Sequence, residues 1–227
     1  MSRLLRTFLL LALLIPAVAK AEHVIVCGGP ALRKWENLRV PADRHDRWWA
    51  NFVRASTLRM VELRKAYGSN APIVWIVHRP GYQSRSSEDG KPYTTWISDL
   101  ARKRNVTLKW FDSSGSFISA INSRPRGSIQ TFDYFGHSNK YCFMFDYGND
   151  IMAASTSWLH QDDLSRIKRS IFAKNAYCKS WGCHTAESMS KVWKRKLGVP
   201  LEGAHGPTDY RVVGKGEMPK VQGRWGR

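Results

Sequence analysis

Short apolar runs, each closed by glycine or proline, alternate along this chain with segments of helical periodicity. The runs at 23–27 and 73–77 (HVIVC and IVWIV) have the length and apolar content of buried strands. Between them, apolar residues from Trp48 to Tyr67 recur at helical spacing, and Gly68 ends the segment. Such alternation is typical of a parallel sheet that is covered by helices.

The rest of the chain continues this alternation. We expect helices over 94–102, 116–122, 159–172 and 185–197, strands over 106–111, 128–135, 142–145, 175–181 and 199–204, and a long mobile loop over 79–93. The predicted fold class is therefore α/β, with three layers: a mostly parallel sheet and helices on both of its faces.

The first 21 residues have the features of a secretory signal peptide. Arg3 and Arg6 precede an apolar run over 8–19, and small residues at 17–19 and 19–21 offer cleavage sites. The run is shorter than the ~20 residues of a spanning helix, although an uncleaved anchor is the alternative. We expect an exported protein, periplasmic or extracellular, with no transmembrane segment after cleavage.

Two parts are expected in the chain after the signal peptide. An α/β domain is expected over 22–213, followed by a flexible basic tail over 214–227.

The full sequence is strongly basic. Its Lys and Arg residues number 36 against 18 Asp and Glu, a net charge of +18, which favours anionic partners. Because no nucleic-acid-binding motif is present, specific nucleic-acid binding is not expected, and a basic face drawn to an anionic surface or polymer is the preferred interpretation.

Two strand ends carry residues that are capable of chemistry. One expected strand ends in Gly136-His137, and a later one ends in Gly182-Cys183. The carboxyl ends of parallel strands meet at one edge of a sheet, where ligands bind. An imidazole there would keep the thiol partly ionised, and a helix beginning just after Cys183 would add its positive end.

Each of these residues also has an ordinary structural interpretation. A lone histidine at a strand end is more often structural than catalytic, and a cysteine in an apolar segment usually belongs to the core. It is the joint occurrence of strand-Gly-His and strand-Gly-Cys in one α/β chain that favours a catalytic pair.

The two segments resemble the His and Cys loops of caspase-like (clan CD) cysteine peptidases, and are most similar to CHAT-type domains. The order is His137 and then Cys183, each at the end of an apolar strand. The polar stretch 161–164 resembles the helix before the Cys strand of CHAT domains, and 183–188 resembles the start of the following helix. The resemblance covers 128–206.

This resemblance implies a secreted thiol protease, a hydrolase of peptide or protein substrates that needs no cofactor. Cys183 would attack the peptide carbonyl, while His137 supports the thiolate and protonates the leaving amine. The backbone at Ser138 and Gly182 would help to bind the oxyanion. The chain departs from the family at His137-Ser138, where the family usually has His-Gly, and it lacks the caspase signature around the cysteine.

Other polar residues are weaker candidates for lining the same edge: Cys27, His78, Asp133, Asp146 and His184. Either acid could orient His137 or shape a pocket, although ordinary structural contacts are the stronger alternative. Cys27 could pack or form a disulfide with another thiol, which an oxidising compartment permits. The spacing of His184 and His205 around Cys183 fits no zinc pattern, so no metal is expected.

Two alternatives to a peptidase remain open at this stage. One is a catalytically inactive relative, the same fold serving as an exported binding module. The other is a basic envelope protein that binds an anionic polymer without chemistry.

Overall fold

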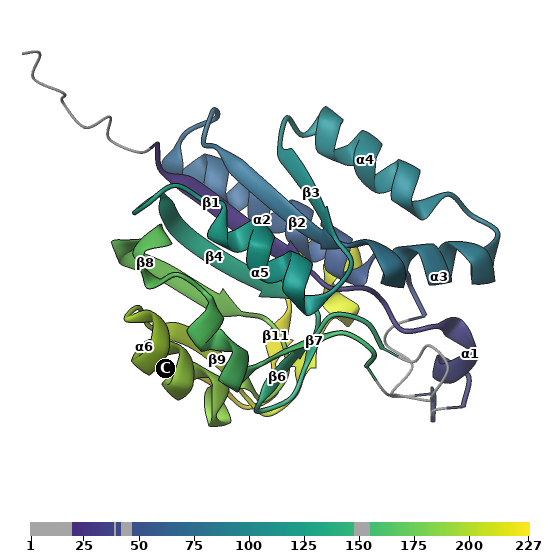
Figure 1. Cartoon of the computed structure of the whole chain (residues 1–227). Coiled ribbons are helices and arrows are strands. Elements are labelled where there is room, and N and C mark those ends of the chain that lie inside the picture. Colours follow the sequence, from purple (N-terminus) through teal and green to yellow (C-terminus); the bar gives the residue numbers. More distant parts are fainter. Residues whose placement is uncertain (1–19, 39, 42–46, 148–154) are drawn as a thin grey trace, which may run out of the picture.

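The structure is a computed structural model that describes residues 20–38, 40–41, 47–147 and 155–227. A central sheet of seven strands has the order β12-β9-β8-β4-β1-β2-β3 (Figure 1). The strands are β1 (Glu22–Cys27), β2 (Ile73–His78), β3 (Thr107–Phe111), β4 (Ile129–Phe135), β8 (Phe172–Ser180), β9 (Leu201–His205) and β12 (Arg224–Gly226). All neighbours pair in parallel except β12, which runs antiparallel to β9.

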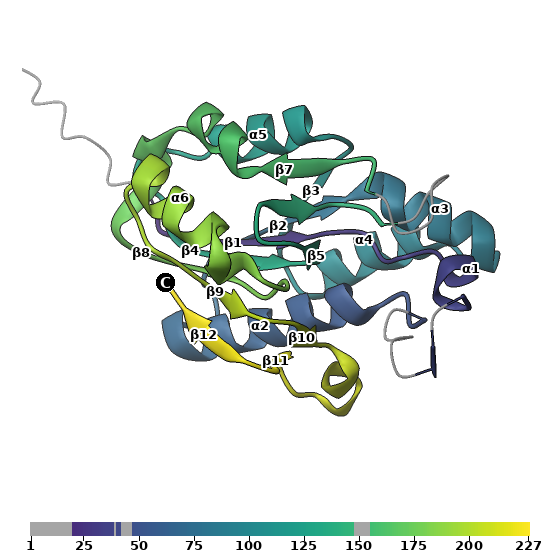
Figure 2. The same ribbon diagram turned by 90° about the horizontal axis from the view of Figure 1, so that it is seen from below.

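Helices cover both faces of this sheet (Figure 2). Apolar residues of α2 (Asn51–Tyr67), α4 (Tyr93–Lys103) and η5 (Arg211–Lys215) form one core with one face of the sheet. Residues of α5 (Ser114–Asn122) and α6 (Met189–Leu197) form a second core with the other face. The predicted three-layer α/β architecture with a mostly parallel sheet is therefore confirmed.

The strands β1 and β2 are largely apolar because both of their faces are buried. Val24 and Val26 of β1 belong to the core under α5 and α6, whereas Ile25 and Cys27 belong to the core under α2. Successive side chains of a strand point to opposite faces, so a strand covered on both sides needs an unbroken apolar run. This is why the runs in the sequence predict the strands well.

Shorter elements complete the chain. They are α1 (Arg33–Glu36), α3 (Arg79–Asp89), β5 (His137–Ser138), β6 (Cys142–Met144), β7 (Trp158–His160), η2 (Gln161–Arg166), η3 (Arg169–Ile171), η4 (Thr185–Glu187), β10 (Thr208–Asp209) and β11 (Lys220–Val221). β5, β6 and β7 form a small antiparallel sheet, and β10 pairs with β11. The η elements are 3₁₀ helices.

Two expectations about helices are wrong. The expected loop over 79–93 contains the helix α3, whose Arg85 guanidinium is buried and is paired with Asp89 at 2.8 Å. The expected helix over 159–172 is instead β7 followed by η2 and η3. The polar helix α3 is stabilised by ion pairs of Arg85 with Glu88 and Asp89. In the segment 159–172, short 3₁₀ turns satisfy the same spacing of apolar residues as an α-helix would.

The C-terminal part of the chain also differs from the expectation of a flexible basic tail over 214–227. Residues 220–221 and 224–226 form β11 and β12, and β12 closes one edge of the central sheet. Pairing with β9 and β10, which no local pattern reveals, orders this glycine-rich and basic segment.

Among the described residues, no helix is both long enough and apolar enough to cross a membrane. Residues 1–19, which hold the apolar run of the expected signal peptide, lie outside the described part of the chain.

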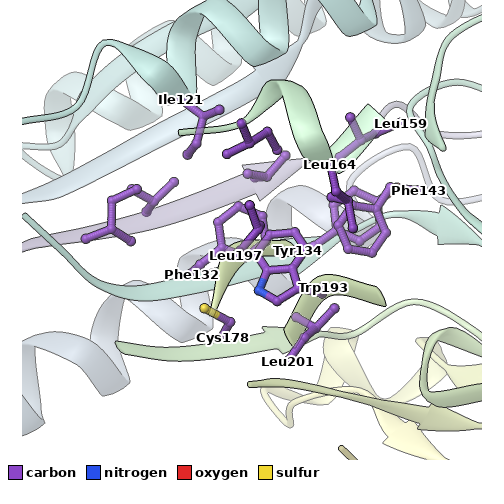
Figure 3. Packing of buried hydrophobic residues seen from close by; sticks show 14 of the residues in the cluster. Ile121, Phe132, Tyr134, Phe143, Leu159, Leu164, Cys178, Trp193, Leu197 and Leu201 are labelled. Carbon is purple, nitrogen blue, oxygen red and sulfur yellow. The ribbon is translucent and has the colours of Figure 1, made fainter. Parts of the chain in front are cut away.

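The core under α6 is built around Trp193, which is fully buried (Figure 3). Its indole packs against Phe132 of β4 at 5.0 Å and Phe172 of β8 at 5.8 Å between ring centroids. We predict that Trp193→Ala lowers the free energy of unfolding by about 3–5 kcal/mol, because it leaves a cavity.

The matched control is Trp158→Ala, since this tryptophan is 46% exposed. Its effect in the same denaturant titration should stay within about 0.5 kcal/mol. Equal losses for the two variants would contradict the central place of Trp193 in the core.

Candidate active site

The parallel register of β4 and β8 brings the two candidate strand ends together. Tyr134 of β4 is the partner of Ser180 of β8, and the Trp181 amide donates to the Tyr134 carbonyl at 2.8 Å. The next residues, Phe135 and Trp181, stack with ring centroids 5.5 Å apart. His137 lies three residues beyond this register pair on one strand, as Cys183 does on the other.

A direct hydrogen bond then fastens the two loops. The Ser138 hydroxyl donates to the Cys183 carbonyl at 2.7 Å. Gly182 lies against this contact, because a Cβ placed on it would be 2.9 Å from the Ser138 Cβ and 3.1 Å from the Gly136 carbonyl oxygen. Glycine is needed at 182 for the two chains to approach this closely.

Two aromatic rings hold the half-buried imidazole of His137. Phe52 of α2 meets it edge to face with ring centroids 5.1 Å apart, and Tyr147 stacks on it at 4.4 Å. The Tyr134 hydroxyl donates to the His137 carbonyl at 2.6 Å, which fixes the backbone. Side chain and backbone of His137 are thus both constrained.

The backbone after His137 leaves the Ser138 amide outside the ladder with β6. The Asn139 amide donates to the Cys142 carbonyl at 3.1 Å, and Ser138 is the partner of Phe143. Because hydrogen-bonded and non-hydrogen-bonded pairs alternate in an antiparallel ladder, Ser138 takes a non-hydrogen-bonded position and its amide points away from β6. The Gly182 amide donates to the Ser180 hydroxyl at 3.3 Å.

Cys183 is half-buried, and its sulfur contacts Thr208 of β10. The Thr208 amide donates to Cys183 Sγ at 3.3 Å, and the Thr208 hydroxyl lies 3.3 Å from the same sulfur. The helix expected over 185–197 is divided into two elements: the 3₁₀ helix η4 covers Thr185–Glu187, and α6 begins only at Met189. The N-terminus of α6 therefore lies six residues beyond Cys183 in the sequence.

Cys27 and His78 end neighbouring strands but are fully buried. The Cys27 thiol lies 3.2 Å from the Tyr82 hydroxyl, and burial raises its pKa to about 12. All four cysteines are free thiols, so Cys27 forms no disulfide. His78 packs against the rings of Phe111 and Phe145. Burial lowers its pKa to about 4, although Asp146 and Asp112 act in the opposite direction.

The two acids near the His loop make structural bonds. Arg59 Nε donates to Asp133 at 3.0 Å and the Trp181 indole donates to it at 2.9 Å. Burial raises the pKa of Asp133, against the opposing effect of Arg59. Asp146 accepts hydrogen bonds from the Ser155 hydroxyl at 2.9 Å and the Ser157 amide at 3.0 Å, so it fastens the segment before β7.

His184 adopts a left-handed backbone with φ of 62°. Its Nδ1 lies 2.6 Å from Glu187 Oε1, and this hydrogen bond lowers the pKa of Glu187. The described residues contain no group of three His, Cys, Asp or Glu side chains that could hold a metal ion.

Three residues at the site carry no functional signal in the sequence. Phe52 belongs to the apolar pattern of α2, Tyr147 follows β6, and Thr208 lies 25 residues after Cys183. Only the packing of distant elements brings them to His137 and Cys183, so no local motif could have identified them.

Comparison with known proteins adds no relative: no protein-family model, curated protein or solved structure matches the chain. The assignment of function therefore rests on the chemistry of the site.

The close approach at Gly182 leads to a test of the site geometry. We predict that Gly182→Ala lowers the free energy of unfolding by about 1–3 kcal/mol, because the new methyl group overlaps the Ser138 side chain. Adding Ser138→Gly should restore part of this loss. Denaturant unfolding measures both effects.

Gly214→Ala is the matched control, because a Cβ there would meet no atom within 4 Å. A Gly182→Ala variant as stable as this control would contradict the packing of the two loops.

The buried imidazole of His78 predicts a dependence of stability on pH. Its pKa is about 4 in the folded protein against an ordinary value of 6.5, so the unfolded chain binds the proton more readily. The free energy of unfolding should therefore fall as the pH decreases from 6.5 to 4, by up to about 3 kcal/mol from this group.

His78→Leu removes the titrating group. It should flatten the pH dependence of unfolding in this window relative to the parent protein, whatever its stability at neutral pH. An unchanged slope between the two proteins would show that His78 is not the group responsible.

Proposed function

We propose that this protein is an exported, caspase-like cysteine endopeptidase in which Cys183 is the nucleophile and His137 the proton carrier. The observation that supports this most is the hydrogen bond from the Ser138 hydroxyl to the Cys183 carbonyl at 2.7 Å. It joins the loop of the histidine to that of the cysteine at the carboxyl edge of the sheet, where parallel sheets place their ligand sites.

The chemistry proceeds in two steps. The thiol proton passes to His137, and the Cys183 sulfur attacks the peptide carbonyl carbon, which pushes an electron pair onto the oxygen. As the C–N bond breaks, the imidazolium returns the proton to the leaving amine. Water then attacks the thioester with His137 as base, which releases the acid and regenerates the thiol.

The backbone around the site supplies a donor for the developing oxyanion. The Ser138 amide points away from β6, whereas the Gly182 amide is directed to Ser180. A well-placed donor of this kind contributes roughly 3 kcal/mol to transition-state stabilisation in hydrolases. We assign this part to the Ser138 amide.

The other thiols of the chain are poor nucleophiles, which makes a selective test possible. Burial raises the pKa of Cys27 to about 12 and of Cys142 to about 11, and it also raises the pKa of Cys178. A thiol reacts as its thiolate, so these three should be inert near neutral pH.

We predict that a peptidyl acyloxymethyl ketone labels the protein once, at Cys183. Cys183→Ala should abolish labelling, and His137→Ala should slow it at least tenfold at neutral pH, because the proton acceptor is lost. Intact-mass measurement and peptide mapping give the extent and the position of the label.

Cys142→Ala is the matched control, since Cys142 is the other half-buried thiol, and it should leave labelling unchanged. Undiminished labelling of Cys183→Ala, or no labelling of the parent protein by a panel of such reagents, would overturn the proposal. The second outcome would favour a binding module of the same fold.

A further inference from the structure

Thr208 holds the sulfur of Cys183 with two groups at once. Its backbone amide donates to Sγ at 3.3 Å, and its hydroxyl lies 3.3 Å from the same atom. Thr208 is 7% exposed, so water does not compete freely for either group.

The segment that carries Thr208 is bound to the segment of Cys183 on both sides. The His184 amide, one residue after the cysteine, donates to the Gly206 carbonyl at 3.0 Å. The Tyr210 hydroxyl donates at 3.0 Å to the carbonyl of Trp181, two residues before the cysteine. Residues on either side of Thr208 are thus fixed to residues on either side of Cys183.

Further contacts stabilise this segment from the rest of the fold. Thr208 is the partner of Val221 in the ladder between β10 and β11. The ring of Tyr210 meets Phe52 edge to face at 4.9 Å, and Phe52 is also the ring that contacts His137. One aromatic side chain of α2 therefore adjoins both the imidazole and the segment that holds the thiol.

We propose that Thr208 is the positioning residue of Cys183, donating its amide and hydroxyl hydrogens to the sulfur of the attacking thiolate and so directing Sγ for attack. The inference rests on the proposed function. Because a thiolate accepts hydrogen bonds more strongly than a neutral thiol does, these two donors hold the sulfur most firmly in its attacking form. The proton released on ionisation goes to His137 or to solvent.

In the competing arrangement, the hydrogen bond between the Thr208 hydroxyl and the Cys183 sulfur runs in the reverse direction. If the thiol donates its own hydrogen to Thr208 Oγ1, the contact favours the neutral form, and removing the hydroxyl moves the midpoint of the alkylation profile in the opposite direction. The sign of the change on removing the hydroxyl thus distinguishes the two arrangements.

Other titratable groups lie on the elements around Cys183 and are common to every variant: His137, Tyr134, His184, Glu187, His205 and Asp209. The Asp209 carboxylate is bound by Arg211 at 2.7 Å, and Glu187 is bound to His184. Because a change at Thr208 adds or removes no charge, these groups contribute equally to the compared profiles.

The experiment measures the rate of alkylation of Cys183 by iodoacetamide against pH in the Cys142→Ala background. Thr208→Val, which replaces the hydroxyl with a methyl group, should move the midpoint of the profile up by about one pH unit. Thr208→Ser keeps the hydroxyl and should leave the midpoint within about 0.3 units. Thr208→Ala serves as a second hydroxyl-free variant should the valine protein fail to fold.

An unchanged or lowered midpoint in the folded hydroxyl-free variant would overturn the inference. The readout does not need peptide hydrolysis, so the two proposals fail separately. A midpoint that rises in a protein unreactive toward peptidyl electrophiles would refute the peptidase and keep the role of Thr208. Labelling of Cys183 by those electrophiles, together with an unchanged midpoint in the hydroxyl-free variant, would refute the role of Thr208 and keep the peptidase.

Discussion

The pairing of β4 with β8 is the constraint on which the site depends. These strands are parallel neighbours in register at Tyr134 and Ser180, so residues equally far beyond each strand meet at the same edge. β4 is buried along nearly all of its length and β8 is buried at its carboxyl end, over Cys178–Ser180, which opposes a slip of register, since a shift by one residue would turn these side chains to the opposite face. A hydrogen bond from Ser138 to the Cys183 carbonyl completes the junction, and Gly182 leaves room for it.

The C-terminal part of the chain is as much a component of the site as the two strands. Thr208 contacts the sulfur, while the antiparallel strand β12 covers the edge of the sheet beside β9. Lys179 of β8 lies between Trp181 and Trp225, 4.1 and 3.9 Å from their ring centroids, and is paired with Glu202 at 2.8 Å. Cation–π contacts of this kind tie β12 to the strand that leads to Cys183.

Sequence patterns predict the elements whose burial is regular and fail where order comes from distant partners. Apolar runs identify β1 and β2 because both faces of these strands are buried, and helical spacing identifies α2 because it buries one face between Asn51 and Leu63. The polar helix α3 escapes prediction, since its buried Arg85 is stabilised by Asp89 and by the Ala31 carbonyl. In the site, glycine followed by His137 or Cys183 at a strand end is a local signal. The contacts of Phe52 and Thr208 depend on tertiary packing, so they leave no local signal in the sequence.

The central claim is that His137 and Cys183 act as one unit on a peptide carbonyl. A crystal structure of the protein after reaction with a peptidyl acyloxymethyl ketone tests this most directly. The account predicts a covalent bond from Cys183 Sγ to the inhibitor, with the His137 imidazole on the same side of the sheet edge and within hydrogen-bond reach of the adduct. An adduct on another thiol, or an imidazole turned away from Cys183 on the far side of the β4–β8 junction, would contradict it.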